Sequence, residues 1–178
     1  MDFVETTLPG LYLIKPKIYE DSRGYFFESF NKKLFANINL SVNFVQDNQS
    51  LSKKNVLRGL HFQVVPFEQG KLVRVVKGSV NDVVVDMRKD SPTFGQSYSV
   101  ILSDKNKLMM WIPPGFAHGF LSLEDNTIFT YKCTAYYNKE SERGIKWNDP
   151  RLNINWNVLN PIVSEKDAEL PSWDEYWS

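Results

Sequence analysis

The sequence contains little cysteine and little histidine, and each shortage excludes a class of protein. Among its 178 residues Cys133 is the one cysteine, so the chain cannot form an internal disulfide and is not a disulfide-stapled scaffold. We interpret Cys133 as a small packed residue. The two histidines, His61 and His118, would need carboxylate partners to complete a three-ligand metal site. We therefore expect no metal centre.

Runs of like charge and long apolar runs are missing as well. The 21 basic residues balance 21 acidic ones, so the charge pattern indicates neither a nucleic-acid surface nor a polybasic membrane patch. The longest apolar runs are too short to span a bilayer. The first residues have neither the basic start nor the apolar core of a signal peptide. We expect a cytoplasmic protein that binds neither nucleic acid nor membrane.

The composition is that of a folded globular protein, with 42% hydrophobic and 14% aromatic residues. The length favours one domain over residues 1–178. We expect a β core over about residues 9–150 and a C-terminal segment, 151–178, that packs over it, because a free tail rarely carries so many aromatic residues.

Short segments rich in Val, Ile, Phe and Tyr recur between turn signals, a rhythm typical of a β-sandwich or β-barrel. They include LYLIKPKIY, GYFFESF, KLVRVV, SVNDVVVDM, QSYSVILS, KLMMWIPPG, GFLSLED and TIFTYKCTAYY. The Lys77-Gly78 link predicts a hairpin between KLVRVV and SVNDVVVDM. Only residues 31–38 and 165–171 look helical, with caps at Asn31 and Ser164.

The stretch NVLRGLHFQ, residues 55–63, combines an arginine and a histidine with apolar neighbours. Strand alternation would put Arg58 and His61 on opposite faces, although Gly59 permits a bulge that breaks the alternation. Histidine is well suited to proton transfer near neutral pH. Taken alone, His61 fits a hydrogen-bonded core histidine better than a base.

Four other polar residues lie within apolar strands or rigid turns. Lys71 heads a Val-rich strand, Asp82 shares a strand face with two valines, and Tyr131 lies mid-strand. His118 follows two prolines and a glycine. Each fits an ordinary structural role by itself, but together they offer a base, a cation and an acid.

Nine segments, in this order and spacing, resemble one family: DSRGYFFES, FVQDNQS, NVLRGLHFQ, QGKLVRVVKG, VVVDMRKDSPTFG, WIPPGFAHGF, YKCTAYY, WNDP and SEKD. The chain resembles the dTDP-4-dehydrorhamnose 3,5-epimerase family from about Pro9 to Leu170. The resemblance implies an all-β, cupin-like double-stranded β-helix, or jelly-roll barrel, with a few short helices. It also implies a homodimer that works without a metal or an organic cofactor.

The resemblance implies a reaction that uses these residues together. The family's substrate is dTDP-4-dehydro-6-deoxy-D-glucose, in which the C4 ketone makes the hydrogens on C3 and C5 removable. His61 matches the base and Asp167 the carboxylate that pairs with it. Lys71 matches the residue near the keto oxygen, and Tyr131 matches the acid on the opposite face. The product would be dTDP-4-dehydro-L-rhamnose, on the way to dTDP-L-rhamnose.

The resemblance also implies a set of substrate contacts, with the arginines suited to a diphosphate and an aromatic ring stacked on the thymine. The matching positions are Arg23, Glu28, Gln46, Asp47, Asn48, Arg58, Lys71, His118, Tyr137, Glu142 and Lys166. Tyr137 would be the stacking ring. The DSRG segment is expected to reach the neighbouring subunit's site. Gln49 departs from the family pattern, in which we expect a histidine.

Other functions remain open at this point. A relative that inverts only C3, or one that moves the keto group, would share the scaffold and much of the nucleotide site. A sugar-binding jelly roll without activity would use the same arginines and aromatic residues, but it would need no base, enolate cation and acid together. A metal-dependent cupin oxygenase is disfavoured by the histidine count.

Overall fold

The structure is a computed structural model that describes residues 1–178 as 13 strands and three short helices. The strands are β1 (Asp2–Glu5), β2 (Tyr12–Lys15), β3 (Tyr19–Asp21), β4 (Gly24–Phe26), β5 (Gln46–Ser52), β6 (Leu57–Gln63), β7 (Lys71–Lys77), β8 (Ser79–Asp86), β9 (Ser97–Ser103), β10 (Met109–Ile112), β11 (Phe116–Ser122), β12 (Thr127–Cys133) and β13 (Glu142–Gly144). The helices are α1 (Lys32–Ala36), α2 (Glu165–Ala168) and α3 (Trp173–Trp177). The prediction of an all-β fold with a few short helices is confirmed.

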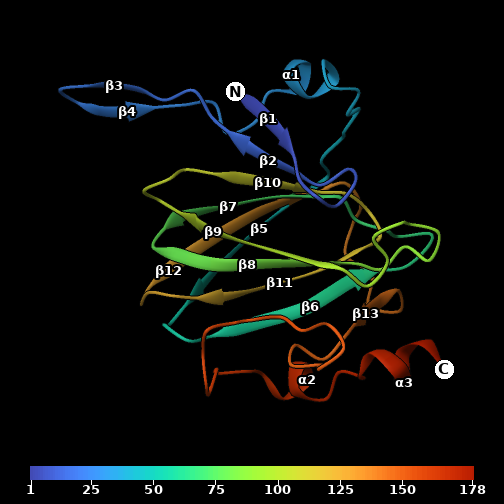
Figure 1. The fold of residues 1–178 in the computed structure, drawn as a ribbon. Coiled ribbons are helices and arrows are strands. Elements are labelled where there is room, and N and C mark those ends of the chain that lie inside the picture. The colour runs from blue at the N-terminus through green and yellow to red at the C-terminus, as the bar shows by residue number, and fades with distance from the viewer.

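Two antiparallel sheets face each other across the centre of the molecule (Figure 1). One has six strands in the order β1-β2-β10-β7-β12-β5, and the other has five in the order β13-β6-β11-β8-β9. A separate hairpin of β3 and β4 extends away from the barrel (Figure 1). Apart from the pairs β1–β2 and β8–β9, neighbouring strands in each sheet come from distant parts of the sequence, which is how a jelly roll differs from a meander.

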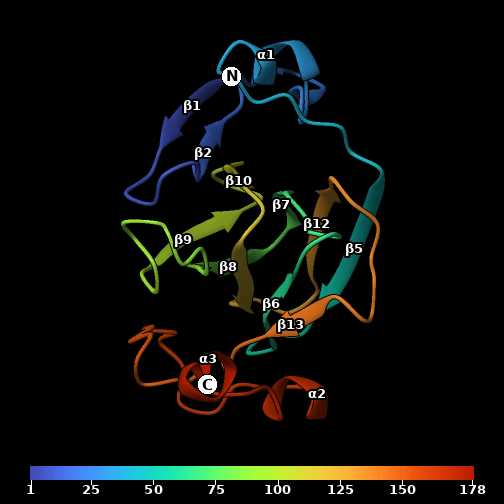
Figure 2. The ribbon, with the colours of Figure 1, turned by 90° about the vertical axis from the view of Figure 1, so that its right-hand side faces the viewer.

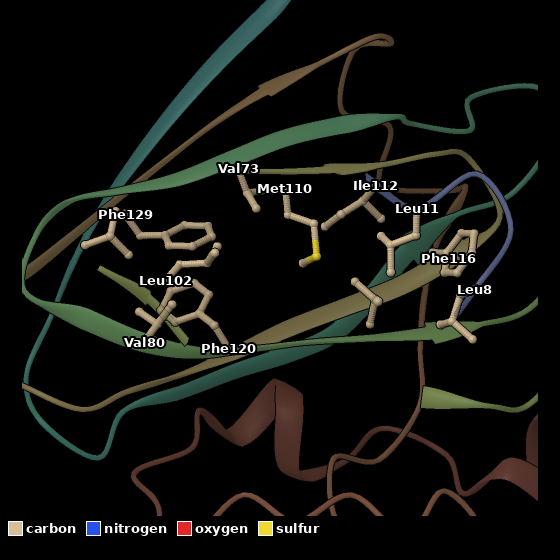
Figure 3. Close-up of a cluster of buried hydrophobic side chains, with 12 residues drawn as sticks. Leu8, Leu11, Val73, Val80, Leu102, Met110, Ile112, Phe116, Phe120 and Phe129 are labelled. Carbon is tan, nitrogen blue, oxygen red and sulfur yellow. The ribbon is translucent and has the colours of Figure 1, made fainter. Parts of the chain in front are cut away.

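Apolar side chains from both sheets fill the space between them (Figure 3). The central cluster consists of Leu8, Leu11, Val73, Val75, Val80, Val84, Leu102, Met110, Ile112, Phe116, Phe120 and Phe129. Strand alternation explains its composition, since Val73 and Val75 point inward from β7 while Leu72 belongs to a cluster on the outer face. Lys71 shares the inward face of β7, which puts a cation at the end of the apolar cluster.

Each sheet is also covered on its outer face (Figure 2). Phe35 of α1 packs with Leu72 and Trp111 against the six-stranded sheet. On the other side, Trp156 and Trp173 of the C-terminal segment pack with strand residues of the five-stranded sheet. Buried between the interior and this C-terminal layer, β8 has no exposed residue. These layers explain why its sequence is so rich in valine.

The expected hairpin between KLVRVV and SVNDVVVDM is wrong. β7 pairs with β10 and β12 in one sheet, whereas β8 pairs with β9 and β11 in the other. Gly78, at a φ of 81°, turns the chain from one sheet to the other. A tight turn signal gives the change of direction, but it does not say whether the two strands continue in one sheet.

The two predicted helices are present and shorter than expected. The predicted caps are confirmed, since the Asn31 side chain accepts from Lys33 N and the Ser164 side chain accepts from Asp167 N. The third helix, α3, was not expected, although Ser172 and Glu175 form a capping box there. No helix is long and apolar enough to cross a membrane.

Candidate active site

A cavity of about 290 Å³ lies between the two sheets. Both sheets and the residues around α2 contribute to its lining, which consists of Ser50, Arg58, His61, Lys71, His118, Gly119, Phe120, Phe129, Tyr131, Ser164 and Asp167. The structure therefore brings together the four residues expected to carry chemistry, His61, Lys71, Tyr131 and Asp167. Arg58 and His118, two of the expected substrate contacts, lie in the same lining.

His61 and Asp167 form a hydrogen-bonded pair although 106 residues separate them. Nε2 of His61 lies 2.7 Å from Oδ1 of Asp167, and Oδ2 of Asp167 accepts from Gly59 N at 3.2 Å. The imidazole is 29% exposed and the carboxylate 6%. Because Nε2 is engaged, Nδ1 of His61 is the nitrogen free to accept a proton from the cavity.

The charge of Asp167 is stabilised by its neighbours. Burial alone would raise its pKa, but the hydrogen bonds from His61 and Gly59 and the nearby Lys166 together hold the pKa below its usual value. Asp167 also sits at the first turn of α2, which Ser164 caps. An ionised carboxylate in a fixed place keeps the Nε2 proton on the ring and orients the base.

A bulge in β6 lets Arg58 and His61 line the same cavity. Arg58 pairs with Phe120, and His61 pairs with His118, so three steps along β6 match two along β11. Gly59, at the irregularity, has a φ of 123°, and a Cβ there would lie 2.5 Å from the Cα of Gly119. The glycine in NVLRGLHFQ is therefore required for the close approach of β6 to β11.

Lys71 lies in the cavity near a second histidine and carboxylate pair. Nε2 of His118 lies 3.0 Å and 3.1 Å from the two oxygens of Asp82, which is fully buried. Burial lowers the pKa of Lys71, and the negative charges of Asp82 and Glu142 oppose that shift. Burial likewise raises the pKa of Asp82, with His118 and Lys71 acting the other way. The fully buried carboxylate of Asp82 thus has His118 as its partner.

Tyr131 and His61 approach the cavity from opposite walls. Tyr131 belongs to β12 of the six-stranded sheet, and His61 belongs to β6 of the five-stranded sheet. Burial raises the pKa of Tyr131, and Cys133 and Glu142 add to the shift while Arg58 opposes it. The phenol therefore keeps its proton at neutral pH and can act as a proton donor.

Four of the expected substrate contacts form a connected group beside the cavity. The carboxylate of Glu142 accepts from the Tyr137 hydroxyl at 2.9 Å and from Lys166 at 2.6 Å. The side chain of Gln46 accepts from Tyr137 N at 2.9 Å. Burial opposes but does not prevent the low pKa of Glu142, because Lys166 and Tyr137 hydrogen-bond to its charged form. Tyr137 is 53% exposed, so its ring is available for contact.

Four further expected substrate contacts do not line the cavity within one chain. Arg23 lies in the projecting hairpin, with its side chain 88% exposed and paired with Asp21. Glu28 accepts from Asn31 after that hairpin. Asp47 pairs with Lys132 on the exposed face of β5, whereas Asn48, on the inward face, donates to Cys133 Sγ.

Sequence reasoning missed some of the cavity lining. Ser50 faces the interior two residues after Asn48, and its hydroxyl has no hydrogen-bond partner within the chain. The alternation in QDNQS is the signal that could have found it. Ser164 was expected only as a helix cap, and it lines the cavity as well. No group of three or more His, Cys, Asp or Glu side chains is placed to hold a metal ion.

Comparison with known proteins identifies the family. The family model described as dTDP-4-dehydrorhamnose 3,5-epimerase matches residues 5–175. The chain belongs to the dTDP-4-dehydrorhamnose 3,5-epimerase family. An epimerase of this family from Shigella flexneri is 52% identical over 168 residues, which cover 94% of this chain and 93% of the relative.

Two solved epimerase structures have the same fold as this chain. The enzyme from Legionella pneumophila, in complex with dTDP-4-keto-L-rhamnose, is 48% identical with a TM-score of 0.93 and covers 97% of this chain and 93% of its own. The epimerase from Bacillus anthracis, with TDP and PPi bound, is 45% identical with a TM-score of 0.94, covering 96% and 98%. The predicted cupin-like jelly roll of the epimerase family is thus confirmed.

Proposed function

We propose that this cavity inverts C3 and C5 of dTDP-4-dehydro-6-deoxy-D-glucose, which gives dTDP-4-dehydro-L-rhamnose for dTDP-L-rhamnose biosynthesis. As a member of its family, the chain is an epimerase, an isomerase that acts on a dTDP-linked sugar. One observation carries the assignment of the residues. The imidazole of His61, oriented by Asp167, faces the protonated phenol of Tyr131 across a cavity that also contains Lys71.

The first step is removal of a proton next to the C4 ketone. Nδ1 of His61 takes the hydrogen of C3 or C5, and the electron pair of that C–H bond forms the double bond of an enolate. The keto oxygen then carries negative charge, which the ammonium of Lys71 stabilises in a site of low dielectric constant. Loss of such a group costs about 100- to 1000-fold in kcat.

The second step returns a proton to the other face of the same carbon. Tyr131 donates its phenolic proton, the enolate electrons form the new C–H bond, and the ketone is restored. His61 releases the proton it accepted to solvent, and the phenolate takes one up. No electron is gained or lost overall, so proton transfers suffice, and the reaction needs no redox cofactor.

The nucleotide would bind at the open side of the cavity. Arg58 lies in the lining and is the guanidinium suited to the diphosphate. Tyr137 offers its ring to the thymine, held beside Glu142 and Lys166. The bound TDP and PPi of the relative from Bacillus anthracis support a nucleotide site on this fold.

A second copy of the chain would complete the site. The hairpin that carries Arg23 extends away from its own barrel (Figure 1), which supports a contact of Arg23 and Glu28 with a neighbouring molecule. Exposed Tyr19, Tyr25 and Phe26 on the hairpin give it an apolar surface for such a contact. We assign the working unit as a homodimer in which each hairpin contributes to the partner's nucleotide site.

Reaction in heavy water tests the function. Incubation with dTDP-4-dehydro-6-deoxyglucose is expected to place deuterium at both C3 and C5, detected by the loss of their proton NMR signals. Deuterium at C3 alone would leave a C3-specific epimerase. Deuterium at neither carbon, with TDP still bound, would leave a sugar-nucleotide binding protein and overturn the epimerase assignment.

A further inference from the structure

The segment of residues 134–138, which carries Tyr137, is held by glutamine side chains. It lies outside the strands and follows β12 at the edge of the cavity. Gln69 donates to the carbonyl of Ala135 at 2.8 Å, and Gln46 accepts from Tyr137 N at 2.9 Å. Side chains thus supply the hydrogen bonds that a strand partner would otherwise provide.

Gln63 makes the most extensive of these contacts. Its Nε2 donates to the carbonyl of Tyr136 at 3.1 Å and to that of Phe67 at 2.5 Å, and its Oε1 accepts from Asn138 N at 2.7 Å. The Gln63 carboxamide therefore hydrogen-bonds to the backbone on both sides of Tyr137. Because Gln63 is only 5% exposed, it cannot itself be a surface contact for the nucleotide.

Gln63 also connects Tyr137 to the catalytic strand. It ends β6, two residues after His61, and its backbone pairs with Glu142 of β13. The carboxylate of Glu142 accepts from the Tyr137 hydroxyl at 2.9 Å. The same two paired residues therefore hold both the backbone and the hydroxyl of Tyr137, which fixes the ring although 53% of the residue is exposed.

We infer that Gln63 is a positioning residue that presents the Tyr137 ring to the nucleotide and fixes its place relative to His61. This inference rests on the proposed function, in which Tyr137 contacts the thymine. A ring held in its binding position before the ligand arrives loses less conformational freedom on binding, and affinity rises accordingly. Gln63 should therefore affect nucleotide affinity more than the chemical step.

The test compares Gln63→Glu with Gln96→Glu. A glutamate at position 63 can still accept from Asn138 N but cannot donate to the carbonyls of Tyr136 and Phe67. Gln96 is exposed before β9 and undergoes the same chemical change far from the cavity. We expect the Kd for TDP and the KM to rise about tenfold in Gln63→Glu, with kcat within about threefold of the parent value. Gln96→Glu should change none of these.

Two further measurements separate positioning from general damage. In a Tyr137→Ala background, Gln63→Glu should cost little additional TDP affinity, because the two residues act through one contact. Amide hydrogen exchange at residues 136–138 should be faster in Gln63→Glu than in Gln96→Glu. If Gln63→Glu does not fold, Gln63→Met removes the two donated hydrogen bonds, and the one accepted from Asn138 N as well, without adding charge.

Several results would overturn the inference. One is a normal TDP affinity in folded Gln63→Glu or Gln63→Met. A second is a lower kcat with an unchanged KM in Gln63→Glu. A third is a loss of TDP affinity in the double variant that equals the sum of the losses in Gln63→Glu and Tyr137→Ala. If Tyr137→Ala alone leaves TDP affinity unchanged, the thymine contact of the proposed function fails, and with it this role of Gln63. A different result is a loss of TDP affinity in Tyr137→Ala with no loss of TDP affinity in Gln63→Glu. That result would contradict only the role of Gln63.

Discussion

At His61, the proposed base, only one of the two ring nitrogens has a partner in the chain. Nε2 is bound to Asp167, while Nδ1 has no partner in the chain and the ring lines the cavity. Asp167 is fixed in turn by Gly59 N and by the cap of α2. A base whose orientation is set in advance needs little rearrangement when the substrate binds.

His61→Ala should abolish isotope exchange at both C3 and C5, because the imidazole assigned to remove either proton is gone. TDP affinity should stay within about threefold of the parent value, since the ring is assigned to the sugar and not to the nucleotide. Proton NMR in heavy water measures the exchange, and calorimetry measures the affinity. Full exchange in this variant would remove His61 from the mechanism.

Tyr131→Phe should separate proton removal from inversion. The variant keeps the aromatic packing against Phe129 but loses the phenolic proton donor. Isotope exchange from the His61 side should continue, while net formation of the epimerised product falls about 100-fold or more. NMR of the same reaction reports both quantities. If inversion keeps its parental rate, another group must supply the proton.

At the scale of elements, a buried carboxylate at the end of β8 holds the loop that follows this strand through hydrogen bonds. Asp86 is fully buried and accepts from Arg88, Ser91 and Thr93. Burial alone would raise its pKa, but these hydrogen bonds outweigh burial and hold the pKa below its usual value of 3.8. Arg88 also donates to the carbonyl of Pro9, which ties the loop to the N-terminal segment.

Asp86→Asn should destabilise the fold in a pH-dependent way. Because the native pKa of Asp86 is depressed, its charge contributes stability above the usual carboxyl value, and that contribution is lost as the pH falls through the native value. We expect a loss of about 2 to 4 kcal/mol in the free energy of unfolding at pH 7. The difference in the free energy of unfolding between variant and parent should become smaller below about pH 4.

Denaturant unfolding of the parent and of Asp86→Asn, from pH 7 to below about pH 4, measures this difference in free energy. Asp90→Asn is a matched control, because Asp90 is exposed in the same loop. If the difference in the free energy of unfolding stays constant down to acid pH, the charge of Asp86 is not the source of the lost stability.

At the scale of the whole molecule, the β3–β4 hairpin pairs with no strand of the two main sheets and extends away from the barrel (Figure 1). Its apolar side chains Tyr19, Tyr25 and Phe26 are all more than half exposed. Arg23 at its tip pairs only with Asp21, a neighbour on the same hairpin. The homodimer proposed above gives this element a place and gives Arg23 a ligand.

Mixing two inactive variants tests the exchange of hairpins. A dimer of one Arg23→Ala chain and one His61→Ala chain would contain one site with both changes and one site with neither. Activity should therefore rise when the two variants are mixed and their subunits exchange, which a coupled assay of product formation measures. Light scattering on the parent protein checks that it is dimeric.

Lys71→Ala mixed with His61→Ala is the control, because both of these residues line the cavity of their own chain. Each site in that mixed dimer has a defect, so no recovery is expected. Absence of recovery in the Arg23 mixture, with subunit exchange verified, would contradict a contribution of Arg23 across the interface.

The sequence by itself predicted the all-β class, the helix caps and the residue types of the site. These features follow from local chemistry: alternation reports the two faces of a strand, and a capping side chain binds backbone groups two or three residues away. The roles of His61, Lys71, Tyr131 and Asp167 came from the resemblance of ordered motifs, since no local pattern pairs residues so far apart. Those roles stay predictions until the variants are measured.

Only the tertiary structure decided which strands share a sheet and which side chains meet. It placed β7 and β8 in different sheets, brought Arg58 and His61 to one cavity through the bulge at Gly59, and gave Asp82 its partner His118. It also separated Arg23 from the cavity of its own chain. The physical reason is that pairing and register depend on long-range hydrogen bonds and on the burial of whole faces, which no window of sequence contains.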